Sequence, residues 1–380
     1  MNKRLKVFCV PWHVSHQFEL VKLAKKYPVD FYFLVNKVRK WGASTYFSGE
    51  SRPCPEHINW VSTYEKGKYD LAILNIDSQC TLETIGKGKL YRAMNDLIQD
   101  IPKIVINHAT PMIPEYGYDE DTVLNGGYIF QGEKQRRIYG MKEMVGDNFM
   151  IVNSYEAVER NQGGFPIIHG MDKDEWWDLP KEPRVVTVLS PGGYDKYYNR
   201  QLLEYVKSQL YERYAIKLFQ FSVDYKPQNW DEYRDFLGRS LIHFYPGYDS
   251  PMPRGRTEAM LSGCCSVTTK HHGADKFTIT GFNGFVVPDN PLTISDLIAK
   301  LMYEEFKYAE DVGRMGKLTA QKIFRVDRYL DTWWKVINCV LENGSMKAQE
   351  ILNKEWRMYE VFEPVKELAK DFSLEVGEKN

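Results

Sequence analysis

The sequence lacks long apolar runs, contains few cysteines and carries almost no net charge. No apolar run approaches the ~18–20 residues that a membrane-spanning helix needs. None of its six cysteines forms a CxxC pair, and their scatter argues against a zinc framework or a disulfide-stapled fold. A net charge of −1 gives no overall attraction to nucleic acid or anionic lipid. We therefore expect reduced thiols in a cytoplasmic protein, with no transmembrane segment.

The chain is too long for one ordinary hydrophobic core. It has 380 residues, of which 43% are hydrophobic and 14% aromatic. Chains of this length usually form two domains. The opening MNKRLKVFCVPW has too few apolar residues before its proline for a signal peptide, and we expect a first strand there.

Short apolar runs alternate with helical periods in both halves of the chain. We expect strands at 6–10, 29–34, 69–73, 103–107, 148–153, 184–189, 216–220, 241–245 and 266–269. We expect helices at 17–26, 90–99, 197–213 and 325–341. Such alternation predicts two parallel, doubly wound sheets. The polar stretch 38–64 fits an ordered excursion or a mobile loop equally well.

The segment 241–288 carries the strongest functional signal. An apolar strand leads through a Pro/Gly turn to a short helix that contains Arg254, Arg256 and Glu258. Gly263 ends that helix, a β-branched strand follows, and Asn283-Gly284 precedes a last strand. Parallel units of this kind bind ligands at the carboxyl ends of their strands. Two cations and a carboxylate at such an edge suit a phosphorylated ligand that is rich in hydroxyl groups.

This segment resembles the donor-binding half of GT-B glycosyltransferases, particularly glycosyltransferase family 4. The matching residues are Glu258-Ala259-Met260, Gly263, Val267-Thr268-Thr269, Gly273, Asp275, Gly281-Phe282-Asn283-Gly284-Phe285 and Pro288. The resemblance implies an α/β, GT-B fold with two Rossmann-like, doubly wound domains facing a crevice and C-terminal helices crossing back to the first domain. It also implies a retaining, metal-independent transfer of a hexosyl or pentosyl group from a nucleoside-diphosphate sugar to an acceptor hydroxyl.

The stretch 166–172 is similar to the linker of that family, with Trp176 or Trp177 in its aromatic position. We therefore expect an acceptor-side domain at 1–168, a donor-binding domain at 169–322, and helices at 323–380 that return to the first domain. The residues 342–380 fit either packing on the first domain or association between chains.

By the resemblance, Glu258 contacts the ribose and the loop of Gly273 and Asp275 lies near the sugar hydroxyls. The loop that contains Gly193 and Lys196 faces the diphosphate, but the family's arginine is missing there. Arg254 or Arg256 would supply that charge; a solvated surface position is the alternative for each of these cations. The family's first glutamate corresponds to Ser250, so either Asp249 has taken over its role or the role has lapsed.

On the acceptor side, His108 follows a predicted strand at a position where the family often has a histidine near the reacting sugar. A neutral imidazole there can both donate and accept a hydrogen bond. His13 follows the first strand and is a second candidate. For both residues the alternative is a packing role satisfied by the neighbouring loop.

No metal or other cofactor is expected. Asp172-Lys173-Asp174 is accounted for by the linker, and the triplet 119–121 lies in an acidic loop without the strand that metal-binding triplets follow. His271-His272 is a poor ligand pair, because adjacent loop residues rarely reach one ion together.

The acceptor stays open among a glycan, a lipid-linked sugar, a protein and a modified DNA base. Basic clusters at 37–40 and 134–137 would suit a polyanion such as hydroxylated DNA, but they also fit ordinary solvated surface. Two further alternatives are a nucleotide-sugar epimerase and a nucleotide-sugar-binding protein whose catalytic site has decayed.

Overall fold

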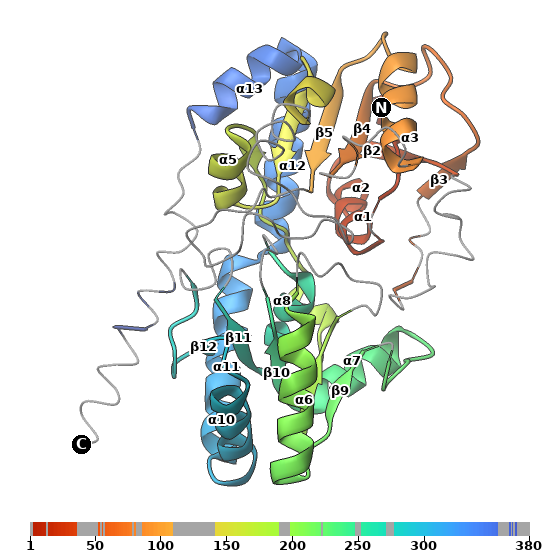
Figure 1. Ribbon diagram of the computed structural model, residues 1–380. Helices are drawn as coiled ribbons and strands as arrows, with labels where there is room; N and C mark the ends of the chain where they lie inside the picture. The colour runs from red at the N-terminus through yellow and green to blue at the C-terminus, as the bar shows by residue number, and fades with distance from the viewer. Residues whose placement is uncertain are drawn as a thin grey trace. The chain divides into compact units, whose positions relative to one another are not determined.

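The computed structural model describes residues 3–12, 14–35, 52, 53, 55, 58–77, 80, 86–108, 141–189, 198–221, 223–247, 252–270, 277–355, 365, 367, 369 and 370. The chain forms two compact units (Figure 1). Among the described residues, unit 1 is drawn from Met1–Pro114, Ile129–Met171 and Val326–Trp356, and unit 2 from Asp172–Arg325 and Arg357–Asn380. The chain leaves unit 1 after Met171 and returns to it at Val326.

Unit 1 is built on a parallel sheet of seven strands in the order β3-β2-β1-β4-β5-β6-β7. Its strands are β1 (Leu5–Cys9), β2 (Val29–Leu34), β3 (Ile58–Val61), β4 (Leu71–Ile76), β5 (Lys103–Asn107), β6 (Phe149–Val152) and β7 (Phe165–Pro166). Strands β4, β5 and β6 are buried along their whole length, as expected for a parallel sheet covered on both faces. The strand order reverses between β1 and β4, where such folds place ligands.

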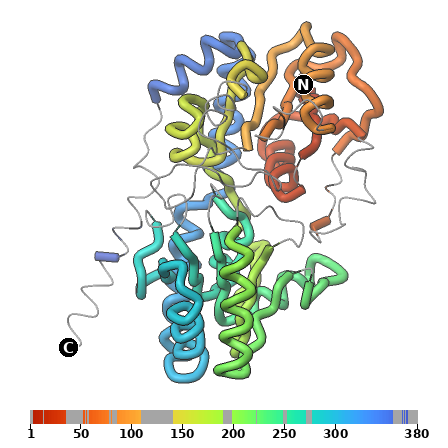
Figure 2. Tube along the Cα trace, in the orientation of Figure 1, coloured from red at the N-terminus to blue at the C-terminus, as the bar shows by residue number. Residues whose placement is uncertain are grey.

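Helices cover both faces of this sheet. They are α1 (Val14–Leu20), α2 (Leu23–Lys26), α3 (Gly86–Leu97), α5 (Tyr155–Asn161), α12 (Val326–Asn343) and α13 (Ser345–Asn353). The apolar stripe of α12, which includes Trp333 and Ile337, packs in the same core as α1 and β1. Helix α13 lies along β6, as Figure 2 shows, and Gln349 accepts a hydrogen bond from the backbone N–H of Met150 (2.7 Å). The C-terminal helices α12 and α13 therefore belong to unit 1.

Unit 2 contains a parallel sheet of five strands in the order β12-β11-β10-β8-β9. Its strands are β8 (Glu182–Thr187), β9 (Leu218–Gln220), β10 (Ser240–Tyr245), β11 (Cys265–Thr269) and β12 (Phe285–Val287). Its helices are η3 (Lys173–Glu175), α6 (Arg200–Tyr214), α7 (Trp230–Arg239), α8 (Arg254–Leu261), α10 (Pro291–Tyr303) and α11 (Phe306–Ile323). The order reverses between β8 and β10.

Helix α11 packs unusually close to the loop between α8 and β11. A Cβ atom added at Gly313 would lie 2.3 Å from the carbonyl oxygen of Gly263. Gly263 itself has φ +75°, the left-handed conformation that favours glycine after a helix end. Both glycines are therefore required by backbone geometry, and together they set the depth at which α11 rests on the sheet.

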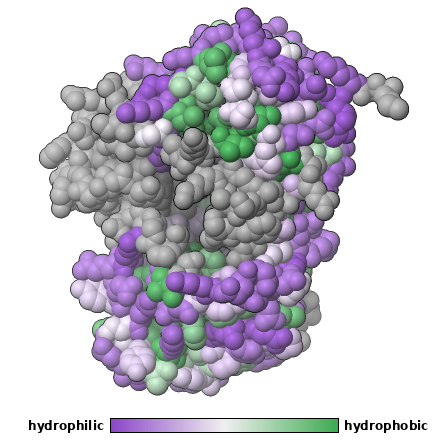
Figure 3. All heavy atoms as spheres, turned by 90° about the vertical axis from the view of Figure 1, so that its right-hand side faces the viewer, coloured by the Kyte–Doolittle hydropathy of each residue, from purple (hydrophilic) through white to green (hydrophobic). Residues whose placement is uncertain are grey.

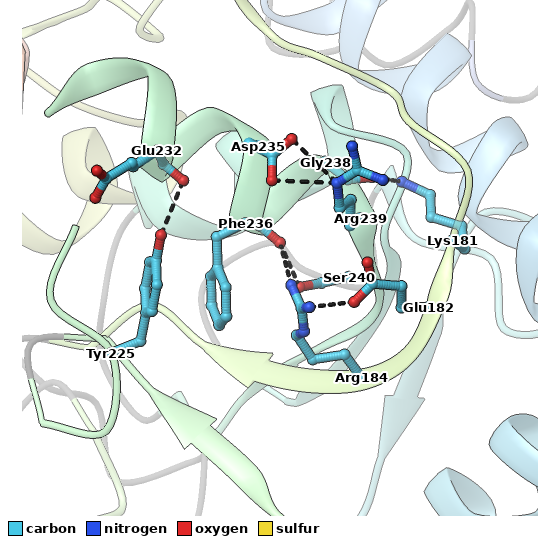
Figure 4. A network of polar contacts seen from close by, with 10 residues as sticks. All are labelled: Lys181, Glu182, Arg184, Tyr225, Glu232, Asp235, Phe236, Gly238, Arg239 and Ser240. Atoms are coloured by element: carbon cyan, nitrogen blue, oxygen red, sulfur yellow. Dashed lines mark hydrogen bonds and ion pairs between the residues drawn. The ribbon is translucent and has the colours of Figure 1, made fainter. Parts of the chain in front are cut away.

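Two cations secure the amino-terminal edge of this sheet (Figure 4). The ammonium group of Lys181 donates to the carbonyl oxygens of Gly238 (2.6 Å) and Ser262 (2.5 Å), which lie at the ends of α7 and α8. The guanidinium group of Arg184 lies 4.6 Å from the ring of Phe236, which also stacks on Tyr225. Cations at helix C-termini complement the partial negative charge of the last carbonyl groups. This edge is structural, and it lies opposite the carboxyl edge of the sheet.

The predicted strands at 29–34 and 103–107 are confirmed as β2 and β5. The prediction of one helix at 17–26 is wrong. Near Val21 and Lys22 the backbone hydrogen bonds span three residues instead of four, as in the bond from the N–H of Lys22 to the carbonyl oxygen of Glu19. This turn separates α1 from α2.

Within the excursion 38–64, residues Ile58–Val61 form the edge strand β3, which no prediction assigned. Its short, half-exposed sequence pairs with β2 and gives little periodic signal. Most other residues of that excursion lie outside the described part of the chain.

Hydrophilic side chains dominate the face of the molecule in Figure 3, with apolar side chains gathered mainly over unit 1. Helices in the described part of the chain are either too short or too polar to cross a bilayer.

Candidate active site

The carboxyl edge of the unit 2 sheet brings the predicted donor residues together in part. Helix α8 follows β10, one of the two strands between which the strand order reverses. The helix carries Arg254, Arg256 and Glu258. The remaining predicted donor residues lie outside the described residues: Gly193, Lys196, Asp249, Gly273 and Asp275. The geometry of this edge is therefore described through α8 and its neighbours.

Glu258 is buried, with 4% of its surface exposed. The hydroxyl group of Tyr233, on α7, donates a 2.6 Å hydrogen bond to its Oε2 atom. The ring of Tyr233 is itself held edge-on by Phe221, with 5.0 Å between ring centroids. A carboxylate that receives such a bond is fixed in orientation while keeping acceptor capacity for a hydroxyl group. Such a carboxylate can accept a hydrogen bond from a hydroxyl group of a ligand.

The two arginines of α8 have different environments. Arg254 is partly exposed at the first position of the helix, after Pro253. Arg256 is fully buried, with its guanidinium group 4.4 Å from the ring of Phe277 and 3.3 Å from Sδ of Met252. Burial lowers the pKa of Arg256 to about 9, because it disfavours the charged form, while Tyr245 opposes that shift. Arg254 is therefore less buried than Arg256 as a whole residue, but its Nε and Nη1 atoms are buried as well.

His243 lies on β10 in the interior of unit 2 and was not singled out from the sequence. Its side chain is fully buried, and neither ring nitrogen has a hydrogen-bond partner in the described part of the structure. Burial, followed by the charge of Arg256, lowers the pKa of His243 to about 3. The imidazole is therefore neutral at physiological pH.

In unit 1, His108 follows β5 and is 8% exposed. Its Nε2 atom lies 2.9 Å from Oδ1 of Asn75, whose Nδ2 group donates to the carbonyl oxygen of Val10 (2.8 Å). Asn153 places Nδ2, a donor, 3.2 Å from Nδ1 of His108. This arrangement favours the neutral tautomer with the proton on Nε2. His108 is thus held at the carboxyl edge of the sheet by Asn75, on β4, and by Asn153, which follows β6.

An aromatic cluster surrounds this imidazole. The ring of Trp12 stacks on His108 with 5.7 Å between centroids, and His16 meets it edge-on at 5.0 Å. Lys87 lies 5.1 Å from the ring of Trp12 and forms an ion pair with Asp77. The second candidate on this edge, His13, lies outside the described residues.

Sequence reasoning missed Tyr233, Asn75 and Asn153, which orient the predicted residues. Tyr233 belongs to no motif, and only the packing of α7 beside α8 brings it to Glu258. Asn75 did leave a signal, because it is a polar residue inside the apolar strand LAILNI. An amide at that place has to find partners when buried, and here they are Val10 and His108.

Two motif residues have structural roles that are visible in the contacts. Asn283 is buried and donates to the carbonyl oxygen of Phe277 (2.8 Å) and to Thr319 on α11 (3.0 Å). Asp172 accepts a hydrogen bond from the backbone N–H of Asp174 (3.0 Å) and caps η3. Across the described residues, no group of three His, Cys, Asp or Glu side chains is arranged to hold a metal ion.

No protein-family model matches the chain, and no curated protein matches it. Several solved structures are similar to it over most of its length. HepE of Anabaena, in complex with UDP and glucose, is 14% identical with a TM-score of 0.60, covering 88% of this chain and 100% of its own. Sucrose-phosphate synthase from Thermosynechococcus elongatus is 12% identical with a TM-score of 0.60, covering 89% and 100%.

The lipopolysaccharide outer core galactosyltransferase WaaB is also similar, with 10% identity and a TM-score of 0.53, covering 88% of this chain and 99% of its own. These similarities extend over nearly the whole length of each protein. Together with the two parallel, Rossmann-like sheets, they show that the chain has the GT-B fold.

Proposed function

We propose that the protein is a glycosyltransferase that moves a sugar from a nucleoside-diphosphate sugar to an acceptor hydroxyl, with retention and without a metal ion. The fold supports this, and so do the named ligands of a structural neighbour, because HepE was solved with UDP and glucose. A UDP-sugar is therefore the first donor to test.

The buried pair of Glu258 and Tyr233 carries the proposal. In the proposed complex Glu258 accepts hydrogen bonds from the ribose hydroxyls, and Tyr233 keeps the carboxylate turned toward them. Burying the carboxylate of Glu258, which is 4% exposed, costs free energy. A buried carboxylate at this edge therefore fits a binding role better than that of a solvated surface charge.

The leaving diphosphate needs stabilisation of its developing charge. We assign this to Arg254, to Lys196 with the backbone of Gly193, and to the N-terminal N–H groups of α8. Arg256 is assigned a supporting role, because its guanidinium group is fully buried against Phe277. Cations fixed in this way would replace the metal ion that other transferases use.

On the acceptor side, we assign His108 to a hydrogen bond with the reacting sugar and His13 to acceptor contact. To do so, His108 would exchange its bond with Asn75 or with Asn153 for one to the sugar, and a neutral ring would add no charge there. Asp249 would take the place of the family's first glutamate, with the loop of Gly273 and Asp275 at the sugar hydroxyls.

A cytoplasmic location is part of the proposal. The five described cysteines are free thiols, and four of them are buried: Cys9, Cys80, Cys264 and Cys265. Burial raises the pKa of Cys80 to about 12 and that of Cys264 to about 11, so these thiols stay protonated and unreactive.

The test is donor binding and turnover in EDTA. Calorimetry with a panel of nucleoside-diphosphate sugars should identify one donor, and slow release of the nucleotide should show turnover. Glu258→Gln should weaken donor binding about tenfold or more, because the ribose loses a charged acceptor. Glu204→Gln, at an exposed position of α6 in the same unit, should bind like the wild type.

Three results would overturn parts of this proposal. Donor binding that is unchanged in Glu258→Gln would remove the assigned site. Turnover only after Mg²⁺ or Mn²⁺ is added would remove metal independence. A product of inverted anomeric configuration by NMR would remove retention. Donor binding without turnover on any acceptor would favour a binding protein with a decayed site.

A further inference from the structure

A small hollow lies inside unit 1, between α1, α12 and the ends of β5 and β6. Its polar lining comes from His16, Gln17, Asn153, His169 and Trp333. It has room for about one water-sized group. All of its lining residues belong to unit 1 and lie in the described part of the chain.

Two of these side chains are buried with unsatisfied polar atoms. Gln17 is 1% exposed, and its Oε1 atom, an acceptor, has no hydrogen-bond partner in the described structure. Trp333 is 2% exposed, and the same holds for its Nε1–H group, a donor. Leaving a buried donor or acceptor unpaired destabilises the folded protein, because the group has lost its hydrogen bonds to water. Two such groups that line one hollow point to a ligand between them.

The two atoms define the chemistry of that ligand. Gln17 Oε1 needs a donor, whereas Trp333 Nε1–H needs an acceptor. A hydroxyl group or a water molecule supplies both, a metal cation cannot accept from the indole, and an anion cannot donate to the amide oxygen. We propose that the hollow is a subsite for one hydroxyl group, filled by water or by a hydroxyl of a sugar, that bridges Gln17 and Trp333.

The position gives this bridge a structural consequence. Ile167 and His169 line the hollow just before the chain leaves unit 1 at Met171, and Tyr329 lines it just after the chain returns at Val326. A hydroxyl group bound there connects α1 to α12 at the base of both crossings.

The hollow also adjoins the His108 network. Asn153 lines it and holds Nδ1 of His108. The proposal does not depend on transferase activity, because it rests on burial and hydrogen bonding within unit 1.

The first test is a pair of crystal structures at a resolution that shows ordered water, one without any carbohydrate or polyol and one soaked in glucose. We expect a peak about 2.7–3.2 Å from both Gln17 Oε1 and Trp333 Nε1. An isolated peak in both crystals identifies water, and density that continues into a ring in the soaked crystal identifies a sugar hydroxyl. A hollow that is empty in both crystals, or a peak that contacts neither atom, overturns the proposal.

The second test is a double-substitution cycle on the full chain in urea. Gln17→Met and Trp333→Phe each remove one half of the bridge with little change in shape. The shift in the urea midpoint for the double variant should be smaller than the sum of the single shifts, because either substitution already breaks the bridge. Additive shifts would contradict a shared ligand.

Trp334→Phe is the matched control. Trp334 neighbours Trp333 but stacks on Tyr27 at 4.6 Å. The shift in the urea midpoint for Trp334→Phe combined with Gln17→Met should equal the sum of the two single shifts. Trp334→Phe should also leave the crystallographic peak in place.

Discussion

The hydroxyl group of Tyr233 on α7 donates a 2.6 Å hydrogen bond to Oε2 of Glu258 on α8. The pair joins two helices that flank β10 and fixes a carboxylate at the carboxyl edge of the unit 2 sheet. Because the proposed ribose contact depends on the direction of that carboxylate, Tyr233 would act on the donor through Glu258.

We predict that Tyr233→Phe weakens nucleotide-sugar binding several-fold, while Glu258→Gln has the larger effect. The phenylalanine keeps the ring contacts with Phe221 but removes the hydroxyl group that orients the carboxylate of Glu258. Calorimetry with the donor measures this directly. Tyr211→Phe, at a position 70% exposed on α6, is the control. Equal affinity of Tyr233→Phe and the wild type would contradict the orienting role.

The buried His243 predicts a specific pH dependence of stability. Its pKa is about 3 in the folded protein and about 6.5 unfolded, so the unfolded chain binds more protons between those values. The His243 contribution to the free energy of unfolding therefore rises with pH across this window, by at most about 1.4 kcal/mol per pH unit, and is flat above it.

The measurement is urea unfolding of the wild type and His243→Phe at several pH values from 4 to 8. The difference in slope between the two proteins isolates His243, because all other groups titrate in both. Parallel curves would show that His243 is not buried in its neutral form.

Lys181→Met should lower the free energy of unfolding by on the order of 2 kcal/mol. The side chain is 6% exposed, and its loss leaves the carbonyl oxygens of Gly238 and Ser262 without their charged donor. Lys307→Met, at a side chain that is 78% exposed, should change stability by less than about 0.5 kcal/mol. Similar losses in both variants would contradict the role of Lys181 at the helix ends.

Gly313→Ala should destabilise the protein by roughly 1–3 kcal/mol, although alanine favours helices. The added Cβ would meet backbone atoms of Gly263 and Cys265, which cannot rotate away. Thermal unfolding gives the result, and Lys322→Ala at an exposed position of α11 is the comparison. A stabilised Gly313→Ala variant would show that α11 can move away from β11.

Strands with dense β-branched and apolar sequence were predictable, because burial of a parallel strand on both faces demands such residues. Strand β5 matches its predicted limits for that reason. Strand β2 also matches, but its sequence VDFYFL alternates between buried and half-buried residues. The edge strand β3 was not predictable, since half of it faces solvent and its pairing with β2 is long-range. The break between α1 and α2 was also missed, because the apolar spacing continues through it.

The sequence alone determined the alternating α/β pattern, the likeness to GT-B donor domains, and the position of Glu258 on a helix after a central strand. The alternation and the helix follow from local periodicity, and the likeness rests on motif residues that occur in the family's order along the chain. Only the tertiary structure decided that Tyr233 orients Glu258, that Asn75 and Asn153 hold His108, and that Arg256 is fully buried while Arg254 is only partly buried. Such relationships depend on how distant elements pack, and no local pattern encodes them.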